Sequence, residues 1–364
     1  MRQGTGVHEA ELPDGSPVWV VTGYDAVIRL LADPVMSASK ADSTTGFRGQ
    51  NLPTGLNENL LNLHGDQHRR VRQLAAAAFA PRHHPAHEKV VAEAVGELVE
   101  DLPTLGVVDL MGGLCEPLPP RVIGPLLGLP REQMPAFRAA ISPLLRLDGS
   151  HVSAAVRESM ATVVGLVAGA IADKRADPRE DLLSQWIAAR DGEDRLSENE
   201  LMSLAFLTIT GGLENVTSMT ALVLDELVRH HQSEGRESLD RPADFAALIG
   251  RLIDITRPTN FALRRFPLTD IDVNGVRIPR GHTVFLSLRS ANLDPARRGR
   301  PHVVFGYGRH YCIGAALAEM EAVHLARAVL QRYPRLEVLG PREGYRLRSS
   351  WLTYALAELR VSAL

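Results

Sequence analysis

The sequence predicts a mainly α-helical protein with a small β part, built as a single domain over residues 1–364. Amphipathic patterns with helical spacing occupy most of the chain between residues 24 and 231. Short β-branched runs occur near the N-terminus and again after residue 257. No repeat, low-complexity tract or Pro/Ser-rich linker divides the chain, so we expect one domain.

The elements of the N-terminal half are expected in the following order. A strand at Pro17–Thr22 (PVWVVT) precedes a helix at Tyr24–Ala32, which Pro34 ends. Asp66 is a candidate cap for a helix that runs to Ala80. Further amphipathic helices are expected at about His87–Leu102, Arg131–Leu145, Val152–Ala176 and Asp181–Arg190.

One long helix is expected at Ser197–His230. Ser197 and Glu200 form a capping-box pattern at its start, and no proline interrupts the residues that follow. At 1.5 Å per residue the helix would be roughly 50 Å long and would cross the whole domain. The elements expected after it are short strands at Ile271–Ile278, around an Asn-Gly turn, and at Thr283–Ser287, and a last helix at Gly314–Arg332.

Composition and charge exclude several classes of protein. Apolar residues make up 45% and charged residues 23%, as in ordinary globular proteins, and the formal net charge of −3 gives no sign of nucleic-acid or anionic-membrane binding. The N-terminus has no secretory signal, and no run of about eighteen uncharged apolar residues is long enough to span a bilayer. Cys115 and Cys312 cannot form a disulfide framework, so we expect a cytoplasmic protein with reduced thiols.

The segment Phe305–Gly314, FGYGRHYCIG, leads directly into the last helix. Gly306 and Gly308 allow a tight turn that passes close to a planar group. Cys312 lies at the helix N-terminus, where free N–H groups and the helix dipole favour a thiolate, and Gly314 leaves room for hydrogen bonds to the sulfur. The alternative is a buried, inert cysteine, but a chance match at all six positions is on the order of one in a million. We therefore predict that Cys312 ligates a metal in a flat cofactor.

This loop resembles the haem-binding loop of the cytochrome P450 family, F-G-x-G-x-H-x-C-x-G before a helix, and the resemblance extends from about Glu11 to the C-terminus. It implies the cytochrome P450 fold, with the long helix over haem b, in a soluble bacterial-type enzyme. It also implies O2 and two electrons as co-reactants, with a ferredoxin-type electron donor. Thiolate ligation of haem, which pushes electron density toward O–O cleavage, is the matching chemistry.

The resemblance assigns the residues that hold the haem. His68 and Arg72 are spaced i, i+4 and face the same way from one helix, like the H-x-x-x-R that binds a haem propionate in the family. The planar fork of arginine suits a carboxylate. The alternative for this pair is an exposed basic face. The full set of expected cofactor-binding residues is His68, Arg72, Arg264, His310, Phe305, Gly308 and Gly314.

The long helix carries Thr210–Asn215 (TGGLEN) near its middle. Two glycines inside a helix cost about 1 kcal/mol each, which a macrocycle and O2 against the backbone would offset. The alternative is a close crossing of two helices. The stretch resembles the oxygen-activating groove of the family and assigns catalytic roles to Gly211, Gly212, Glu214 and Asn215. Asn215 stands where threonine is usual, and because an amide relays a proton less readily than a hydroxyl, weaker coupling to hydroxylation is expected.

Two further features depart from the family pattern or depend on its fold. Asp254-Ile255-Thr256-Arg257 replaces the usual E-x-x-R, so we expect a structural role for both charged residues with a rearranged ion pair. Six arginines would gather on the face nearest Cys312 and suit the docking of an acidic electron-transfer protein, unless they are merely solvated charge. They are Arg69, Arg70, Arg297, Arg298, Arg300 and Arg309.

We expect a haem-thiolate oxidase that hydroxylates a small apolar or aromatic molecule of secondary metabolism, because the walls implied by the resemblance carry few charged groups. The expected substrate contacts are Leu207, Thr210, Phe261, Leu263 and Trp351. One alternative is oxidative coupling of rings in an aromatic or peptide-derived metabolite, which needs hydrogen abstraction and no oxygen insertion. Another is a degenerate haem-binding or ligand-sensing protein.

Overall fold

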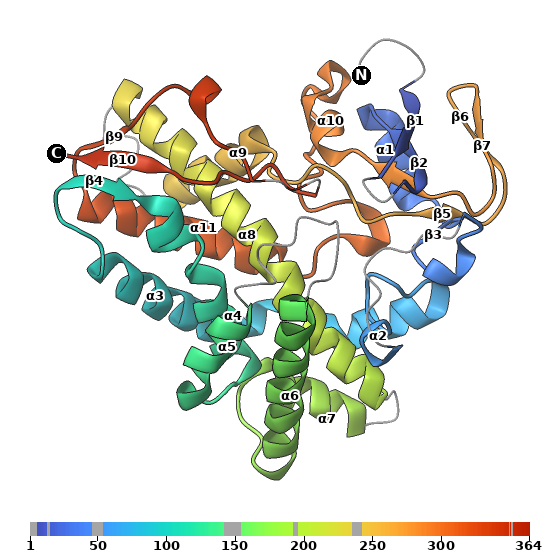
Figure 1. Cartoon of the computed structure of the whole chain (residues 1–364), viewed down its shortest axis with the longest axis horizontal. Helices are drawn as coiled ribbons and strands as arrows, with labels where there is room; N and C mark the ends of the chain where they lie inside the picture. Colours follow the sequence, from blue (N-terminus) through green and yellow to red (C-terminus); the bar gives the residue numbers. More distant parts are fainter. Residues whose placement is uncertain are drawn as a thin grey trace.

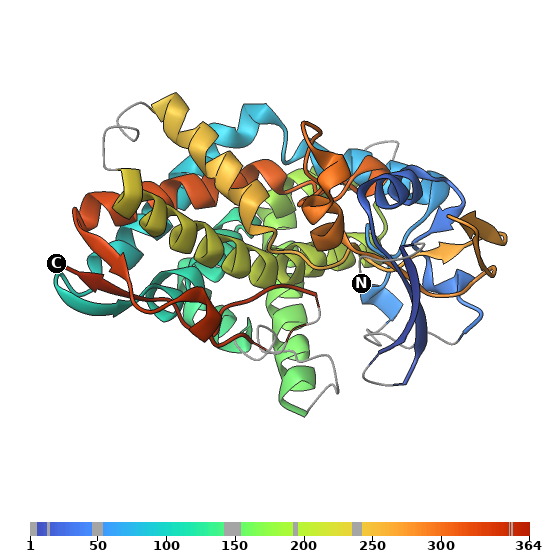
Figure 2. The same cartoon turned by 90° about the horizontal axis from the view of Figure 1, so that it is seen from above.

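The computed structural model describes residues 6–12, 15–45, 54–141, 154–191, 196–234, 242–348, 350 and 352–364. Helices form most of this part of the chain, and short strands form the rest (Figure 1). The helices gather around the long helix α8, while strands β1 and β2 lie at the opposite end of the molecule (Figure 2). The prediction of a mainly helical fold with a small β part is confirmed.

Most predicted helices form close to their expected positions. α1 (Tyr24–Ala32) has the predicted bounds. α2 begins at Gly65, so Asp66 does not cap it and instead lies in its first turn, paired with Arg69. The others are α2 (Gly65–Ala77), α3 (His84–Glu100), α5 (Met134–Ile141) after a 3-10 turn at Arg131–Gln133, α6 (Ala154–Ala176), α7 (Leu182–Asp191) and α11 (Ala315–Arg332).

The long helix α8 (Glu198–Glu234) has 37 residues and is therefore roughly 55 Å long. Its start is the predicted capping box: the backbone N–H of Ser197 donates to Glu200 Oε2 at 2.8 Å, and the N–H of Glu200 donates to Ser197 Oγ at 3.0 Å. α8 crosses the helical part and packs against α4, α9 and α11 (Figure 1).

Three helices were not anticipated: α4 (Leu118–Leu127), α9 (Pro242–Thr256) and α10 (Leu288–Leu293). Eight of the ten residues of α4 are buried, and its sequence LPPRVIGPLL contains three prolines and a glycine, which give little local indication of a helix. Its prolines at 119 and 120 lie in the first turn, where a missing N–H costs nothing. A π-helical turn at Met111–Cys115 precedes it.

The strands connect distant parts of the chain. β2 (Pro17–Val21) pairs with β1 (Val7–Glu11) on one side and in parallel with β8 (Val284–Leu286) on the other. The predicted hairpin turns at Asn274-Gly275, where both residues have positive φ (54° and 84°). The remaining pairs are β6 (Ile271–Val273) with β7 (Val276–Ile278), β3 (Met36–Ser37) with β5 (Phe266–Pro267), and β10 (Arg360–Ala363) between β4 (Gly106–Asp109) and β9 (Leu336–Val338).

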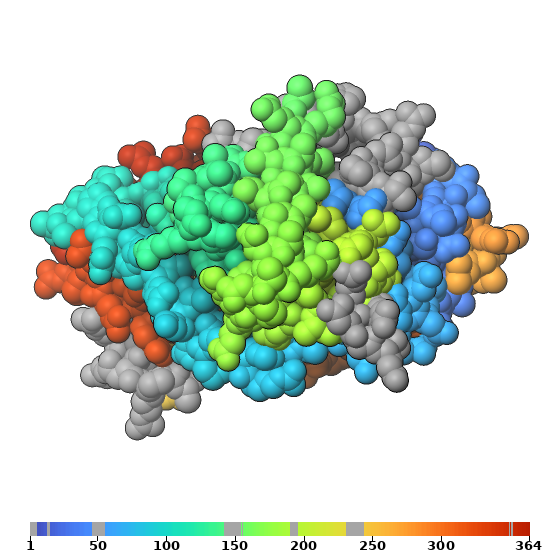
Figure 3. Space-filling view, turned by 90° about the horizontal axis from the view of Figure 1, so that it is seen from below, coloured from blue at the N-terminus to red at the C-terminus, as the bar shows by residue number. Residues whose placement is uncertain are grey.

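The main hydrophobic core runs through the helical part, and a smaller core lies between the β1-β2-β8 sheet and α1. Figure 3 shows α6 standing as a ridge on one face of the molecule. Within the described ranges, no helix is both long enough and apolar enough to cross a membrane.

Candidate active site

The cysteine loop is held in a tight turn immediately before α11. The backbone N–H of Cys312 donates to the carbonyl of Phe305 at 3.0 Å, and the N–H of Gly306 donates to Val303 at 2.9 Å. Gly306 and Gly308 have φ of 77° and 70°, in the left-handed region that favours glycine. A Cβ on Gly308 would also lie 3.1 Å from the carbonyl oxygen of Leu31 in α1. Both glycines are therefore required by the turn that presents Cys312.

The two cysteines have different surroundings: Cys312 is exposed and Cys115 is buried. Desolvation of the Cys312 sulfur by the packed loop raises the pKa of its thiol, while a hydrogen bond from the Gly314 backbone N–H and the charge of Arg72 lower it. A metal ion at this sulfur would hold it as the thiolate. Complete burial raises the pKa of the Cys115 thiol to about 12, so Cys115 is a structural residue.

Two imidazoles from the predicted set lie side by side near the loop. The ring centroids of His68 and His310 are 4.0 Å apart, and the Nε2 atom of each is buried with no hydrogen-bond partner in the described structure. Desolvation, followed by the charges of Arg72 and Arg309, lowers the pKa of His68 to about 4. Desolvation, followed by the charge of Arg265, lowers the pKa of His310 to about 2. Cationic groups thus surround two imidazole nitrogens that have no acceptor.

The predicted arginines have different partners. Arg72 on α2 donates to the carbonyl oxygen of Tyr311 at 2.6 Å, which ties this helix to the cysteine loop. Arg264 is buried and donates to the Leu61 carbonyl at 3.4 Å and to Asn62 Oδ1.

Arg265 is a functional candidate that the sequence analysis missed. Its side chain is buried, its pKa is lowered to about 10 by burial and by the charge of Arg309, and its own charge acts on both His310 and His68. Adjacent residues of an extended segment point to opposite sides, so Arg264 and Arg265 have different surroundings. No local pattern in the sequence separates the two adjacent arginines; their packing in the fold does.

This arrangement fits a haem with its propionates. Buried cationic and N–H groups need acceptors, and no described carboxylate lies within ion-pair distance of His68, His310, Arg72 or Arg265. Two propionate groups would supply those acceptors. The hollow beside them, of about 530 Å³, is lined by Gly65, His68, Arg69, Arg72, Gln73, Ala76 and Arg309.

The predicted residues of α8 share one face of the helix. Positions 207, 210, 211, 214 and 215 are spaced i, i+3, i+4, i+7 and i+8, and none of them is buried, whereas Ile209, Leu213 and Val216 between them are buried. The structure therefore brings together, on one stripe, all the α8 residues expected at the site except Gly212: Leu207, Thr210, Gly211, Glu214 and Asn215.

The two glycines of this stretch have different surroundings. Gly211 is exposed on the stripe, and its carbonyl oxygen accepts a hydrogen bond from Asn215 Nδ2 at 3.2 Å. A Cβ on Gly212 would lie 2.6 Å from Cδ1 of Ile123, so Gly212 is where α4 crosses α8. Helix packing explains Gly212, while the predicted site role remains open for Gly211.

Three segments expected to form the substrate walls meet at Glu214. Its Oε1 accepts hydrogen bonds from Ser350 Oγ at 2.6 Å and from Thr353 Oγ1 at 2.5 Å. Thr353 in turn forms an antiparallel bridge with Thr259. The α8 stripe, the segment after α9 and the C-terminal segment are thus directly connected.

The remaining predicted substrate contacts lie in the segment after α9 or beyond the described part of the chain. Phe261 packs edge-to-face on Phe285, with ring centroids 5.8 Å apart, against the β1-β2-β8 sheet. Leu263 is half-buried, and its carbonyl accepts a hydrogen bond from Arg265 at 2.8 Å. Trp351 lies outside the described residues.

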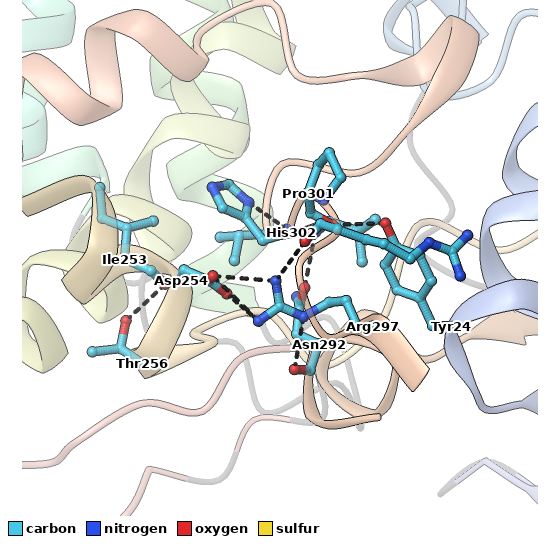
Figure 4. A network of polar contacts seen from close by, with 11 residues as sticks. Tyr24, Ile253, Asp254, Thr256, Asn292, Arg297, Pro301 and His302 are labelled. Atoms are coloured by element: carbon cyan, nitrogen blue, oxygen red, sulfur yellow. Dashed lines mark hydrogen bonds and ion pairs between the residues drawn. The ribbon is translucent and has the colours of Figure 1, made fainter. Parts of the chain in front are cut away.

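Asp254 has the structural role expected of it, and its partner is Arg297 (Figure 4). Arg297 Nη2 lies 2.9 Å from Asp254 Oδ1, and Arg297 Nε donates to the Asn292 carbonyl at 3.1 Å. The carbonyl of Arg257 accepts a hydrogen bond from Arg289 at 2.8 Å. The ion pair therefore fixes the end of α9 to the segment that precedes the cysteine loop.

These contacts correct the predicted docking patch. Arg297 is only 16% exposed and is committed to Asp254. Arg70 pairs with Glu200, and Arg300 pairs with Asp25 at 2.6 Å. Arg69 pairs with Asp66 at 2.9 Å, so four of the six arginines neutralise carboxylates of this chain. Arg69 and Arg309 line the hollow near His68.

Comparison with known proteins identifies relatives of this chain. Cytochrome P450 monooxygenase PikC of Streptomyces venezuelae is 33% identical over 346 residues, which cover 90% of this chain and 81% of PikC. Nocardicin C N-oxygenase of Nocardia uniformis subsp. tsuyamanensis is 30% identical over 370 residues, 96% of this chain and 91% of the relative. No family model matches the chain.

Solved structures give the same result. The ligand-free P450 monooxygenase TamI superposes on this chain with a TM-score of 0.87 and 32% sequence identity. The match covers 99% of this chain and 88% of TamI. The cytochrome P450 PksS of Bacillus subtilis superposes on this chain with a TM-score of 0.89 and 26% sequence identity. The match covers 100% of this chain and 94% of PksS. The resemblance seen in the sequence is confirmed, and the chain belongs to the cytochrome P450 family of haem-thiolate monooxygenases.

Proposed function

We propose that this enzyme binds haem b through Cys312 and hydroxylates a small, mainly apolar or aromatic molecule of secondary metabolism, with electrons from a ferredoxin-type donor. The observation that carries the proposal is the intact cysteine loop beside His68 and His310, whose buried Nε2 atoms lack acceptors. PksS is named for polyketide biosynthesis, which supports a secondary metabolite as substrate.

When bound, the haem supplies O2 activation at a thiolate-ligated iron. Cys312 would hold the iron, and the Gly314 N–H would tune the sulfur by its hydrogen bond. His68 and His310 would donate from Nε2 to the propionates. Arg72 and Arg265 would neutralise the propionate charge, with Arg264, Phe305 and Gly308 completing the cradle.

The α8 stripe would form the wall against which the substrate and O2 lie. Glu214 leaves Oε2 to accept a hydrogen bond from water or substrate, because its two hydroxyl partners contact Oε1. Asn215 donates one amide hydrogen to the Gly211 carbonyl, so its second N–H and its Oδ1 can bind water or substrate. Leu207, Thr210, Phe261, Leu263 and Trp351 would complete the substrate contacts.

Oxidative ring coupling is a second candidate, and Asn215 is the observation that favours it. An amide in this position has no hydroxyl proton to relay. Coupling needs hydrogen abstraction from the substrate and no oxygen insertion, so the substitution would be less harmful to it.

One experiment separates these functions. Compounds that perturb the Soret band of the haem-loaded enzyme are incubated with a surrogate electron donor under isotope-labelled O2, and the products are analysed by mass spectrometry. Hydroxylation places one labelled oxygen in the product. Coupling gives an unlabelled product lighter by two hydrogens. Ligands that all return unaltered would contradict both functions and indicate a sensor.

A further inference from the structure

The carboxylate of Glu214 is held by hydroxyl groups on one of its two oxygens. Thr353 is buried, and its backbone N–H donates to Ser350 Oγ at 3.2 Å, so the Ser350 hydroxyl accepts from one neighbour and donates its own hydrogen to Glu214. Both hydroxyls contact Oε1, and Oε2 accepts nothing from the described residues. The two hydroxyl groups thus bind one oxygen of the carboxylate, and the other oxygen is available to accept a hydrogen bond from a ligand.

No cation of the described chain neutralises Glu214. Its carboxylate takes part in no ion pair with a described lysine, arginine or histidine. The arginines of the neighbouring segments are engaged elsewhere: Arg289 lies over the ring of Tyr354, 4.2 Å from its centroid, and Arg348 pairs with Glu116. A carboxylate that loses its water to a bound substrate is costly unless a partner compensates its charge.

The position of Glu214 indicates that a bound molecule supplies the compensating cation. It lies on the same α8 stripe as Leu207, Thr210 and Asn215, at the junction with the C-terminal segment. A molecule bound against this stripe would therefore lie beside the Glu214 carboxylate, whose Oε2 has no described donor. The available oxygen is a hydrogen-bond acceptor with negative charge, for which a protonated nitrogen is the complementary group.

We propose that Glu214 binds a protonated amine of the substrate, so that the substrate is a basic amine with an apolar or aromatic body. Ser350 and Thr353 are positioning residues, which hold Oε1 and thereby aim Oε2 at the nitrogen. The inference rests on the proposed function in one respect: the substrate occupies the site beside α8.

The test is a binding measurement on the haem-loaded enzyme. The probes are matched pairs in which a tertiary amine nitrogen is replaced by CH, such as N,N-dimethyl-4-phenylbutylamine and (5-methylhexyl)benzene, together with pairs built on fused-ring and longer alkyl bodies. Equilibrium dialysis at neutral pH gives the dissociation constants without any turnover. The position of the Soret band identifies any amine that ligates the iron directly, and such pairs are set aside.

Wild-type enzyme should bind the amine of a pair about tenfold more tightly than its CH counterpart, as expected for one charged hydrogen bond. Glu214→Gln should abolish that preference while leaving the affinity for the CH compound unchanged, because glutamine keeps an acceptor for both hydroxyls. Ser350→Ala combined with Thr353→Val should reduce the preference. Glu358→Gln removes a carboxylate of the same C-terminal segment that pairs with Arg346 at 3.2 Å, and should retain the full preference.

Three results would overturn the inference. The first is that the wild-type enzyme shows no preference for amines, and the second is that the preference survives Glu214→Gln. The third is that Glu214→Gln loses affinity equally for both members of each pair. The third would show that Glu214 only supports the fold. The proposed function fails separately, in the labelled-oxygen experiment. If the enzyme hydroxylates only neutral compounds, the proposed function stands and the amine-binding role of Glu214 is wrong.

Discussion

The imidazole rings of His68 and His310 lie 4.0 Å apart, and each has a buried Nε2 atom with no acceptor in the described structure. One ring comes from α2 and the other from the cysteine loop, so the contact joins the two sequence motifs expected to hold the haem. Both pKa values are lowered, which leaves the rings neutral at pH 7 without the haem. Haem propionates would supply both missing acceptors.

The first prediction concerns the stability of the haem-free protein as a function of pH. The pKa of His68 is lowered to about 4 in the folded protein. Unfolding restores a value near 6.5, so the unfolded state binds more protons below that pH and the free energy of unfolding falls as the pH decreases. From pH 7 to pH 5 this residue alone accounts for a loss of about 2 kcal/mol.

Urea denaturation of the haem-free protein at both pH values measures the effect. His68→Gln should show a correspondingly smaller loss, and so should the haem-loaded wild-type protein, because an anionic propionate raises the pKa of the imidazole. Equal losses in wild-type and variant would show that His68 does not carry the pH dependence.

The second prediction concerns the ion pair between Asp254 and Arg297. Arg297→Ala should lower the free energy of unfolding by about 2 kcal/mol, because it leaves a half-buried carboxylate without its partner. It should also speed haem loss to apomyoglobin, since the pair braces the segment before the cysteine loop. The control is Arg298→Ala at the adjacent exposed position, which should change neither quantity. Identical behaviour of the two variants would contradict the structural role of this pair.

The third prediction concerns the coupling of electrons to product. Asn215→Thr introduces a hydroxyl at the position where Asn215 now donates to the Gly211 carbonyl. If the enzyme hydroxylates its substrate, this variant should release at least about twofold less hydrogen peroxide per electron pair consumed, because a positioned proton donor speeds the productive reaction. Glu214→Gln should slow product formation. An unchanged peroxide yield in Asn215→Thr would contradict a role for this position in proton delivery.

The fourth prediction concerns electron delivery. Arg69 and Arg309 line the hollow next to Arg72, which itself contacts Tyr311 beside Cys312. Reversal of both to glutamate should slow reduction by an acidic ferredoxin about tenfold at low salt, and much less at high salt, where charges are screened. Arg131→Glu, on the distant 3-10 turn before α5, serves as the control. Equal rates for all three proteins at low salt would exclude this surface from docking.

The features predicted from the sequence were those that depend on neighbouring residues. The bounds of α1, the capping box of α8, the Asn274-Gly275 turn and the cysteine loop are each determined by a few consecutive side chains or by required positive φ values. The α8 residues of the site were assigned by the family resemblance, and helical spacing places all of them except Gly212 on one stripe.

Features that depend on packing could not be predicted in this way. The choice between Arg264 and Arg265 depends on which side of an extended segment faces His310. The partners of Glu214 are 136 and 139 residues away in the chain, and only the folded C-terminal segment brings them to α8. Arg297 was expected in the docking patch on the face nearest Cys312, yet the fold places it against Asp254.

The central claim is that Cys312 ligates the haem iron, and the spectrum of the reduced protein with carbon monoxide tests it most directly. The wild-type protein should show the strongly red-shifted Soret band of a thiolate-ligated haem. Cys115→Ser, which changes only the buried cysteine, should keep that band, and Cys312→Ser should lose it. An unchanged red-shifted band in Cys312→Ser would contradict the account.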